Sequence, residues 1–166
     1  MRTAASEPRG RDARRVADAV YGTILVVAVV AALSEDHGAS PGEILGGALA
    51  TSIVFWIVHV YAEVLSRGTE GDPAPFWTLV RISASQEWPL VEAALAPCLP
   101  LLLGAIGVLG RSASITLSII IGLAGLVGWG YAAGRAMKQS RLASLATAAG
   151  ALILGVVMVL LKNLVH

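Results

Sequence analysis

The sequence has little charge, one cysteine and few aromatic residues. Of its 166 residues, 14% are charged and 56% are hydrophobic, whereas soluble domains contain about 25% charged residues. So little charge cannot cover a water-facing surface, and we therefore expect lipid to surround much of the molecule. The net charge of +1 and the lack of a basic stripe give no indication of nucleic-acid binding. Because Cys98 is the single cysteine, no disulfide can form within the chain.

Familiar catalytic and binding motifs are missing as well. The sequence contains no glycine-rich phosphate loop, no serine-nucleophile motif and no paired-cysteine metal motif. The segment "GWGYAAGR" does not follow a predicted strand, so its glycines are interpreted as helix-packing residues. The sequence thus leaves any cofactor unknown, and it favours a non-enzymatic function over an enzymatic one without deciding between them.

Long apolar segments are the main positive feature. Crossing about 30 Å of hydrocarbon takes about 20 apolar residues in a helix. Five segments meet this length, at about residues 16–33, 44–66, 88–109, 114–137 and 142–165. Between the second and third, Phe76, Trp77 and Trp88 favour a short interfacial helix with aromatic rings at headgroup level. The sequence predicts an all-α bundle of five transmembrane helices, forming a single transmembrane domain (16–166) after a basic leader (1–15).

Lysine and arginine are distributed unequally between the connecting segments. On one side of the predicted membrane lie Arg2, Arg9, Arg11, Arg14, Arg15, Arg67, Arg81, Arg135, Lys138 and Arg141. Only Arg111 and Lys162 lie on the other side. Because cytoplasmic loops carry the excess of positive residues, the sequence predicts a multi-pass protein of the cytoplasmic (inner) membrane, with its N-terminus inside and its C-terminus outside.

Ionisable residues recur near the inner ends of the first three predicted spans. The candidate site consists of Asp18, His59, Glu63 and Glu92, with Tyr21, Trp56 and Arg135 as supporting residues. His59 and Glu63 are four residues apart and therefore share one helical face. A charge at the membrane centre costs about 2.5–3.5 kcal/mol on insertion scales. Such groups at one depth are expected to pair, to line a wet cavity or to bind a cation.

Three interpretations of this site stay open. Histidine is a common proton-relay side chain, so His59 could relay protons. Alternatively, a neutral imidazole and carboxylates could ligate a divalent metal, whose identity the sequence leaves unknown. In the third interpretation, the residues are interfacial charges that reach headgroups or pair with Arg15, Arg67 or Arg135.

Prolines and glycines in the third and fourth spans indicate how the helices pack. Pro97 and Pro100 each remove a backbone hydrogen bond. We therefore expect the third helix to be kinked or locally broken just beyond Glu92, either as a cavity wall or for packing alone. The candidate packing residues of the fourth span are Gly122, Gly125, Gly128, Gly130 and Gly134. They would let a backbone approach closely, either within the chain or between copies in a homo-oligomer.

Two segments resemble a known family. "ADAVYGTILVVAVVAAL" is similar to the first helix of the potassium channels found in lysosomes and bacteria, and "FWIVHV" is similar to the Trp-x-x-His spacing of their second helix. The resemblance implies that Asp18 is the first-helix aspartate and that Ile24 with its neighbours lines a pore. That family has six helices per repeat and Phe-Ser before the aspartate, where this chain has Val16 and Ala17. The whole chain also resembles small integral membrane proteins of actinobacteria.

Three functions follow from these features. The leading hypothesis is an ion channel or a proton- or cation-coupled transporter that uses the candidate site. The second is a membrane enzyme or lipid-binding protein that adds Arg81 or Arg135 at headgroup level. The third is a non-catalytic subunit that acts by assembly through the glycines of the fourth span. In each case the lipid bilayer is a partner, and a homo-oligomer is a further expectation.

Overall fold

Helices make up the described part of the chain, which comprises residues 7–164, with side chains described for 15–160. In this computed structural model they are α1 (Glu7–Leu33), α2 (Pro41–Thr69), α3 (Phe76–Gln86), α4 (Pro89–Ala105), α5 (Arg111–Ala136) and α6 (Arg141–Leu164). Five stretches are long and apolar enough to cross a membrane: Arg15–Leu33, Pro41–Thr69, Phe76–Ala105, Arg111–Ala136 and Arg141–Leu160. The predicted all-α bundle is therefore confirmed, including the short helix before the third span.

The leader extends the first helix rather than preceding it. α1 begins at Glu7, within the predicted leader, and continues without interruption into the first span. Residues 1–6 of the leader and residues 165–166 at the end of the fifth predicted span lie outside the described residues. The side chains of Arg9, Arg11, Arg14 and Lys162 also lie outside the range for which side chains are described.

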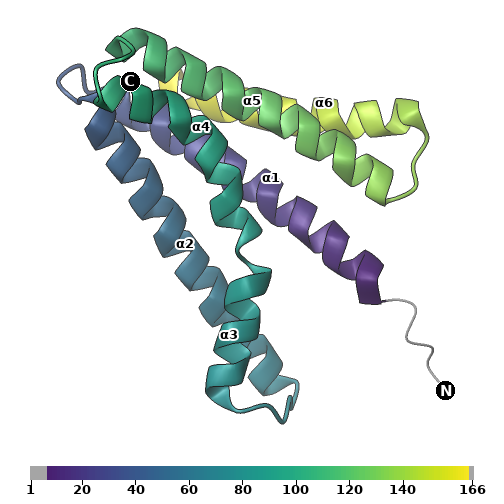
Figure 1. The fold of residues 1–166 in the computed structure, drawn as a ribbon. Coiled ribbons are helices and arrows are strands. Elements are labelled where there is room, and N and C mark those ends of the chain that lie inside the picture. The colour runs from purple at the N-terminus through teal and green to yellow at the C-terminus, as the bar shows by residue number, and fades with distance from the viewer. Residues whose placement is uncertain (1–6, 165–166) are drawn as a thin grey trace.

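α1 is the central helix of the bundle. It contacts α2, α4, α5 and α6. Figure 1 shows α1 running between α2 and the α5–α6 pair, with the helices close together where α1 ends and farther apart where it begins. We call these the closed end and the open end of the bundle. α3 lies at the open end, against the C-terminal part of α2.

The core is built from small and medium-sized apolar side chains. One buried cluster joins four helices and consists of Val26, Val30, Ile44, Ala48, Ala94, Cys98, Leu101 and Ile115. The outward surface is apolar too: on α2 it includes Ile53, Val54, Ile57 and Val58. Apolar side chains on both the inside and the outside are what a helix bundle surrounded by lipid presents.

Glycines set the closest approaches between helices. A Cβ on Gly22 of α1 would overlap the backbone carbonyl of Leu90 in α4. On Gly130 it would lie 2.8 Å from the Ala148 Cα, and on Gly134 it would lie 2.6 Å from the Ser144 Cα. Gly22 was not among the predicted packing residues.

The five predicted packing glycines of α5 do not behave alike. Gly130 and Gly134 pack against the α6 backbone, and Gly122 packs against the side chain of Val27. Gly125 has ordinary space around it, with the nearest heavy atom 3.6 Å from an added Cβ, and Gly128 has nothing within 4 Å. The α5 glycines therefore mainly allow close packing within the chain, and their role between copies stays a prediction.

α4 is continuous through its two internal prolines. The helix runs from Pro89 to Ala105, and the interruption lies before Glu92, at residues 87–88 between α3 and α4. The expected local break beyond Glu92 is therefore wrong, since the interruption precedes that residue, and a kink at the two prolines stays a prediction. The Ser118 hydroxyl of α5 donates a hydrogen bond of 2.6 Å to the Pro97 carbonyl oxygen. α4 ends at Ala105, before the residue 109 predicted, because Gly107 adopts a positive φ of 80° that terminates helices readily.

Local signals also fix the closed end of the bundle. Ser40 and Glu43 form a reciprocal capping box at the start of α2, with Pro41 in the first turn. Arg111, the first residue of α5, donates hydrogen bonds to the carbonyl oxygens of Ser34 (3.1 Å), Asp36 (2.7 Å) and Ala39 (2.8 Å). The α1–α2 loop is thereby tied to the start of α5.

Candidate functional site at the open end of the bundle

Tyr21 of α1 and His59 of α2 meet across the interface between these two helices. Their ring centroids are 5.3 Å apart and the rings are tilted by 52°. The Phe55 ring completes the cluster, with its centroid 6.2 Å from that of Tyr21 and 6.5 Å from that of His59. The structure therefore brings together two of the predicted residues that come from different spans.

The His59 ring is held by its own helix. Its Nδ1 atom lies 2.9 Å from the carbonyl oxygen of Phe55. A carbonyl oxygen only accepts hydrogen bonds, so Nδ1 carries the proton in the neutral ring. The other nitrogen, Nε2, is then the basic atom of this half-buried imidazole.

Asp18 lies on α1 one turn before Tyr21. Its side chain is half-buried, and Ala19, Gly22 and Thr23, which follow it, are buried between helices. Asp18 therefore lies one turn before Gly22, the residue at which α1 packs closely against Leu90 of α4. This places a carboxylate, a phenol and an imidazole on two adjacent helices near the open end.

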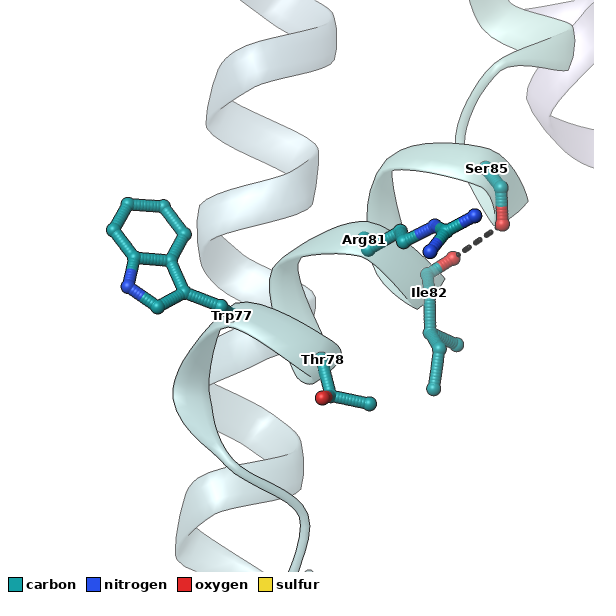
Figure 2. A pocket seen from close by; sticks show the side chains of 5 residues that line it. All are labelled: Trp77, Thr78, Arg81, Ile82 and Ser85. Atoms are coloured by element: carbon teal, nitrogen blue, oxygen red, sulfur yellow. Dashed lines mark hydrogen bonds between the residues drawn. The ribbon is translucent and has the colours of Figure 1, made fainter.

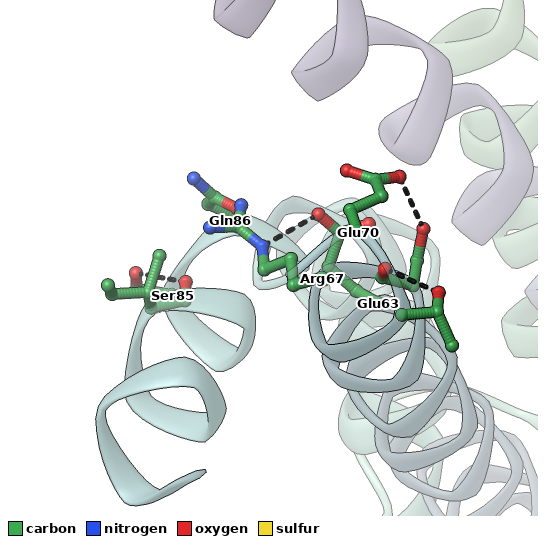
Figure 3. Close-up of polar contacts among 8 residues, drawn as sticks. Glu63, Arg67, Glu70, Ser85 and Gln86 are labelled. Carbon is green, nitrogen blue, oxygen red and sulfur yellow. Dashed lines mark hydrogen bonds and ion pairs between the residues drawn. The ribbon is translucent and has the colours of Figure 1, made fainter. Parts of the chain in front are cut away.

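Glu63 belongs to a different contact. Its Oε1 accepts a 3.0 Å hydrogen bond from Nε of Arg67, one turn later on α2. Arg67 also donates to the side-chain oxygen of Gln86 at the end of α3. Figure 3 shows Arg67 between these two partners. Of the three interpretations, ion pairing with Arg67 fits Glu63, and the expected sharing of one site with His59 is not seen in the contacts.

Two glutamates near the start of α4, Glu87 and Glu92, differ in burial. Glu92 is exposed on α4, in line with the exposed Leu95 and Leu99, and its carboxylate makes no hydrogen bond or ion pair within the described side chains. Glu87, at the junction of α3 and α4, is 5% exposed. The structure thus does not bring Glu92 to Asp18 and His59, and Glu87 is a buried carboxylate that the candidate site did not include.

The two remaining supporting residues also have defined positions. The Trp56 Nε1 donates a 3.1 Å hydrogen bond to the Ala84 carbonyl oxygen of α3, and its ring packs edge-on against Trp88. Arg135 is exposed at the end of α5 and donates to the Gln139 carbonyl oxygen. Trp56 therefore fixes α3 on α2, and neither residue contacts Tyr21 or His59.

Metal ligation finds no support in the arrangement of side chains. Among residues 15–160, no group of three or more His, Cys, Asp or Glu side chains is placed to hold a metal ion. Two buried hydroxyls deeper in the bundle are bonded to their own helices: Thr23 donates to the Ala19 carbonyl oxygen and Ser52 to that of Ala48. The ring contact between Tyr21 and His59 is therefore what the structure assembles of the candidate site, with Asp18 one turn earlier on α1.

The chain matches no protein-family model, no curated protein and no solved structure. Its class is defined by the fold itself: an α-helical protein with five helices long and apolar enough to span a membrane.

Proposed function

We propose that this protein binds and transfers protons or cations at the α1–α2 interface, with Asp18, Tyr21 and His59 as the site. The contact between the Tyr21 and His59 rings, which joins two candidate spans, carries this proposal. Ionisable residues are rare within membrane spans because charging them there is costly, and they commonly mark ion and proton pathways.

Each residue has a distinct part in the proposed site. The imidazole takes up a proton at Nε2, because Nδ1 is already committed to the Phe55 carbonyl oxygen. The Asp18 carboxylate lies on the neighbouring helix α1, one turn before Tyr21, and is the anionic group of the proposed site. The Tyr21 hydroxyl can both donate and accept, so it can link the site to water at the open end.

The core favours a transporter rather than an open channel. Towards the closed end, Val26, Val30 and Ile44 are completely buried and leave an apolar barrier between the site and the other side. The open end faces the cytoplasm in the predicted orientation. Asp18 and His59 are also two of the residues that resemble the lysosomal and bacterial potassium channels, which supports a role in ion handling. A homo-oligomer remains compatible with Gly128, whose α5 face is open.

Proteoliposome measurements test this function. Wild-type protein should dissipate an imposed proton or potassium gradient faster than empty liposomes do. His59→Ala should slow that flux by at least about tenfold, since positioned proton-transfer groups contribute on the order of 100-fold or more. Glu92→Gln is the matched control, because Glu92 is exposed outside the assembled site. No flux from the wild type, or equal losses in the two variants, would contradict the proposal.

A further inference from the structure

A shallow hollow lies on the exposed face of α3, away from the α1–α2 interface. It has a volume of about 700 Å³ and is lined by Trp77, Thr78, Arg81, Ile82 and Ser85. Figure 2 shows Arg81 projecting from α3 together with Thr78, Ile82 and Ser85, and Trp77 projecting on the other side. The lining thus combines one cation, two hydroxyls and apolar surface.

Arg81 is a cation without a counter-charge in the described structure. It is exposed, and no side chain among residues 15–160 forms an ion pair or hydrogen bond with it. Arg67, the other arginine of this hairpin, is already bonded to Glu63 and Gln86. The guanidinium of Arg81 is therefore available for an anionic ligand, and Thr78 and Ser85 lie on the same side of α3.

Helix lengths place α3 at the membrane boundary. α4 has 17 residues, which is about 26 Å of helix, so α4 crosses most of the hydrocarbon and lies at the lower end of the usual length of a transmembrane helix. α2 has 29 residues, which is about 43 Å and extends past the hydrocarbon by about 13 Å. α3 packs against the C-terminal part of α2 through Leu79, Val60 and Val64. α3 therefore lies where α2 leaves the hydrocarbon and α4 enters it.

Aromatic side chains support the same depth. Trp77 is 77% exposed. Phe76, beside it, and Trp88, just after the other end of α3, are exposed as well. Tryptophan is enriched at the headgroup level of membranes, because its ring is apolar and its N–H is polar. A surface of this kind, outside the packed core, matches a phospholipid with its phosphate on Arg81 and its acyl chains along Ile82 and α4.

We propose that the α3 hollow binds the phosphate-bearing headgroup of an anionic phospholipid in the leaflet at the open end of the bundle. Charge complementarity selects the anionic lipid, since no described carboxylate neutralises Arg81. The opposite face of α3 is fixed by Leu79 and by the hydrogen bond from Trp56, so the hollow is presented on a rigid element. This site is independent of the transport proposed for Asp18, Tyr21 and His59.

Native mass spectrometry of the full chain, titrated with phosphatidylglycerol or phosphatidylcholine, tests the proposal. Wild-type protein should retain phosphatidylglycerol in preference. Arg81→Gln should weaken its apparent affinity by about tenfold, as expected for loss of a charge-assisted hydrogen bond. Arg135→Gln removes an equally exposed arginine at the same end of the bundle and should change it by less than about twofold.

Three results would overturn the inference. The first is equal weakening by the Arg81 and Arg135 variants, which would reveal only general charge attraction. The second is equal retention of phosphatidylglycerol and phosphatidylcholine by the wild type. The third is full displacement of the lipid by excess inorganic phosphate, which would assign the hollow to a free anion. Because Arg81 is exposed, Arg81→Gln should keep the wild-type helical content, which circular dichroism verifies.

Discussion

Replacing Gly22 by alanine should destabilise the bundle more than its small size suggests. Gly22 lies where α1 crosses α4, and an added Cβ would meet the oxygen, carbon and Cα atoms of Leu90. These are backbone atoms, which cannot rotate away as a side chain can. The two helices would have to separate, and that would loosen the neighbouring buried residues Thr23 and Val26. Overpacking of this kind costs about 1–3 kcal/mol in the free energy of unfolding.

Gly128 provides the matched control for this substitution. It lies in the middle of α5, and nothing lies within 4 Å of an added Cβ. Gly128→Ala should therefore leave the stability unchanged or raise it by up to about 1 kcal/mol through helix propensity. Unfolding of the two variants in mixed micelles with increasing dodecyl sulfate, followed by circular dichroism, gives the comparison. If Gly22→Ala proves as stable as Gly128→Ala, the tight crossing of α1 and α4 is wrong.

Two hydrogen-bond predictions can be measured in the same assay. Arg111→Gln should lower the free energy of unfolding by about 2–3 kcal/mol, because three loop carbonyl oxygens lose a charged donor. Amide hydrogen exchange should also become faster across residues 34–40, and unchanged exchange would contradict this role of Arg111. Ser118→Ala should lower the free energy of unfolding by about 1 kcal/mol, because it removes the hydrogen bond to the Pro97 carbonyl oxygen. Ser112→Ala, at an exposed position of the same helix, should have no measurable effect. Equal effects of the two substitutions would show that the hydrogen bond is unimportant for stability.

The fold could be predicted from the sequence because lipid imposes a simple requirement on composition. Each span needs a long apolar segment, and these segments are visible without knowing how the helices pack. The short α3 could also be predicted, since Phe76 and Trp77 follow a polar, proline-containing turn. The interruption near Glu92 was expected on the wrong side of that residue. Prolines at 97 and 100 can stay within a helix when a neighbour such as Ser118 satisfies a freed carbonyl oxygen.

The candidate site was harder to predict because depth along a span does not define rotation about the helix axis. Tyr21 lies on the side of α1 that approaches α2, while Glu92 lies on the outward side of α4. The sequence predicts a similar membrane depth for Tyr21 and Glu92, and only the packing of the helices shows that one faces inward and the other outward. Glu63 illustrates a second difficulty, because Arg67 one turn later was as close in sequence as His59. The i, i+4 spacing alone does not decide between two such partners.

Burial of Glu87 could not be predicted from its neighbours either. It lies in the two-residue junction between α3 and α4, where the chain changes direction. The sequence "QEWP" indicates that a new helix begins there, since proline is frequent at the first position of a helix. It does not indicate which way the side chain turns when the next helix begins.

Crosslinking in native membranes tests the central claim that α1 and α2 meet at Tyr21 and His59. Cys98 is replaced by alanine, and cysteines are introduced as Tyr21→Cys with His59→Cys, or as Tyr21→Cys with Glu92→Cys. A short bis-methanethiosulfonate, which reacts with two thiols and releases a sulfinate from each end, should crosslink the first pair within one chain, because the native ring centroids are 5.3 Å apart. It should leave the second pair open, because Glu92 is on the outward face of α4. Crosslinking of the second pair but not the first would contradict the arrangement on which the proposed site depends.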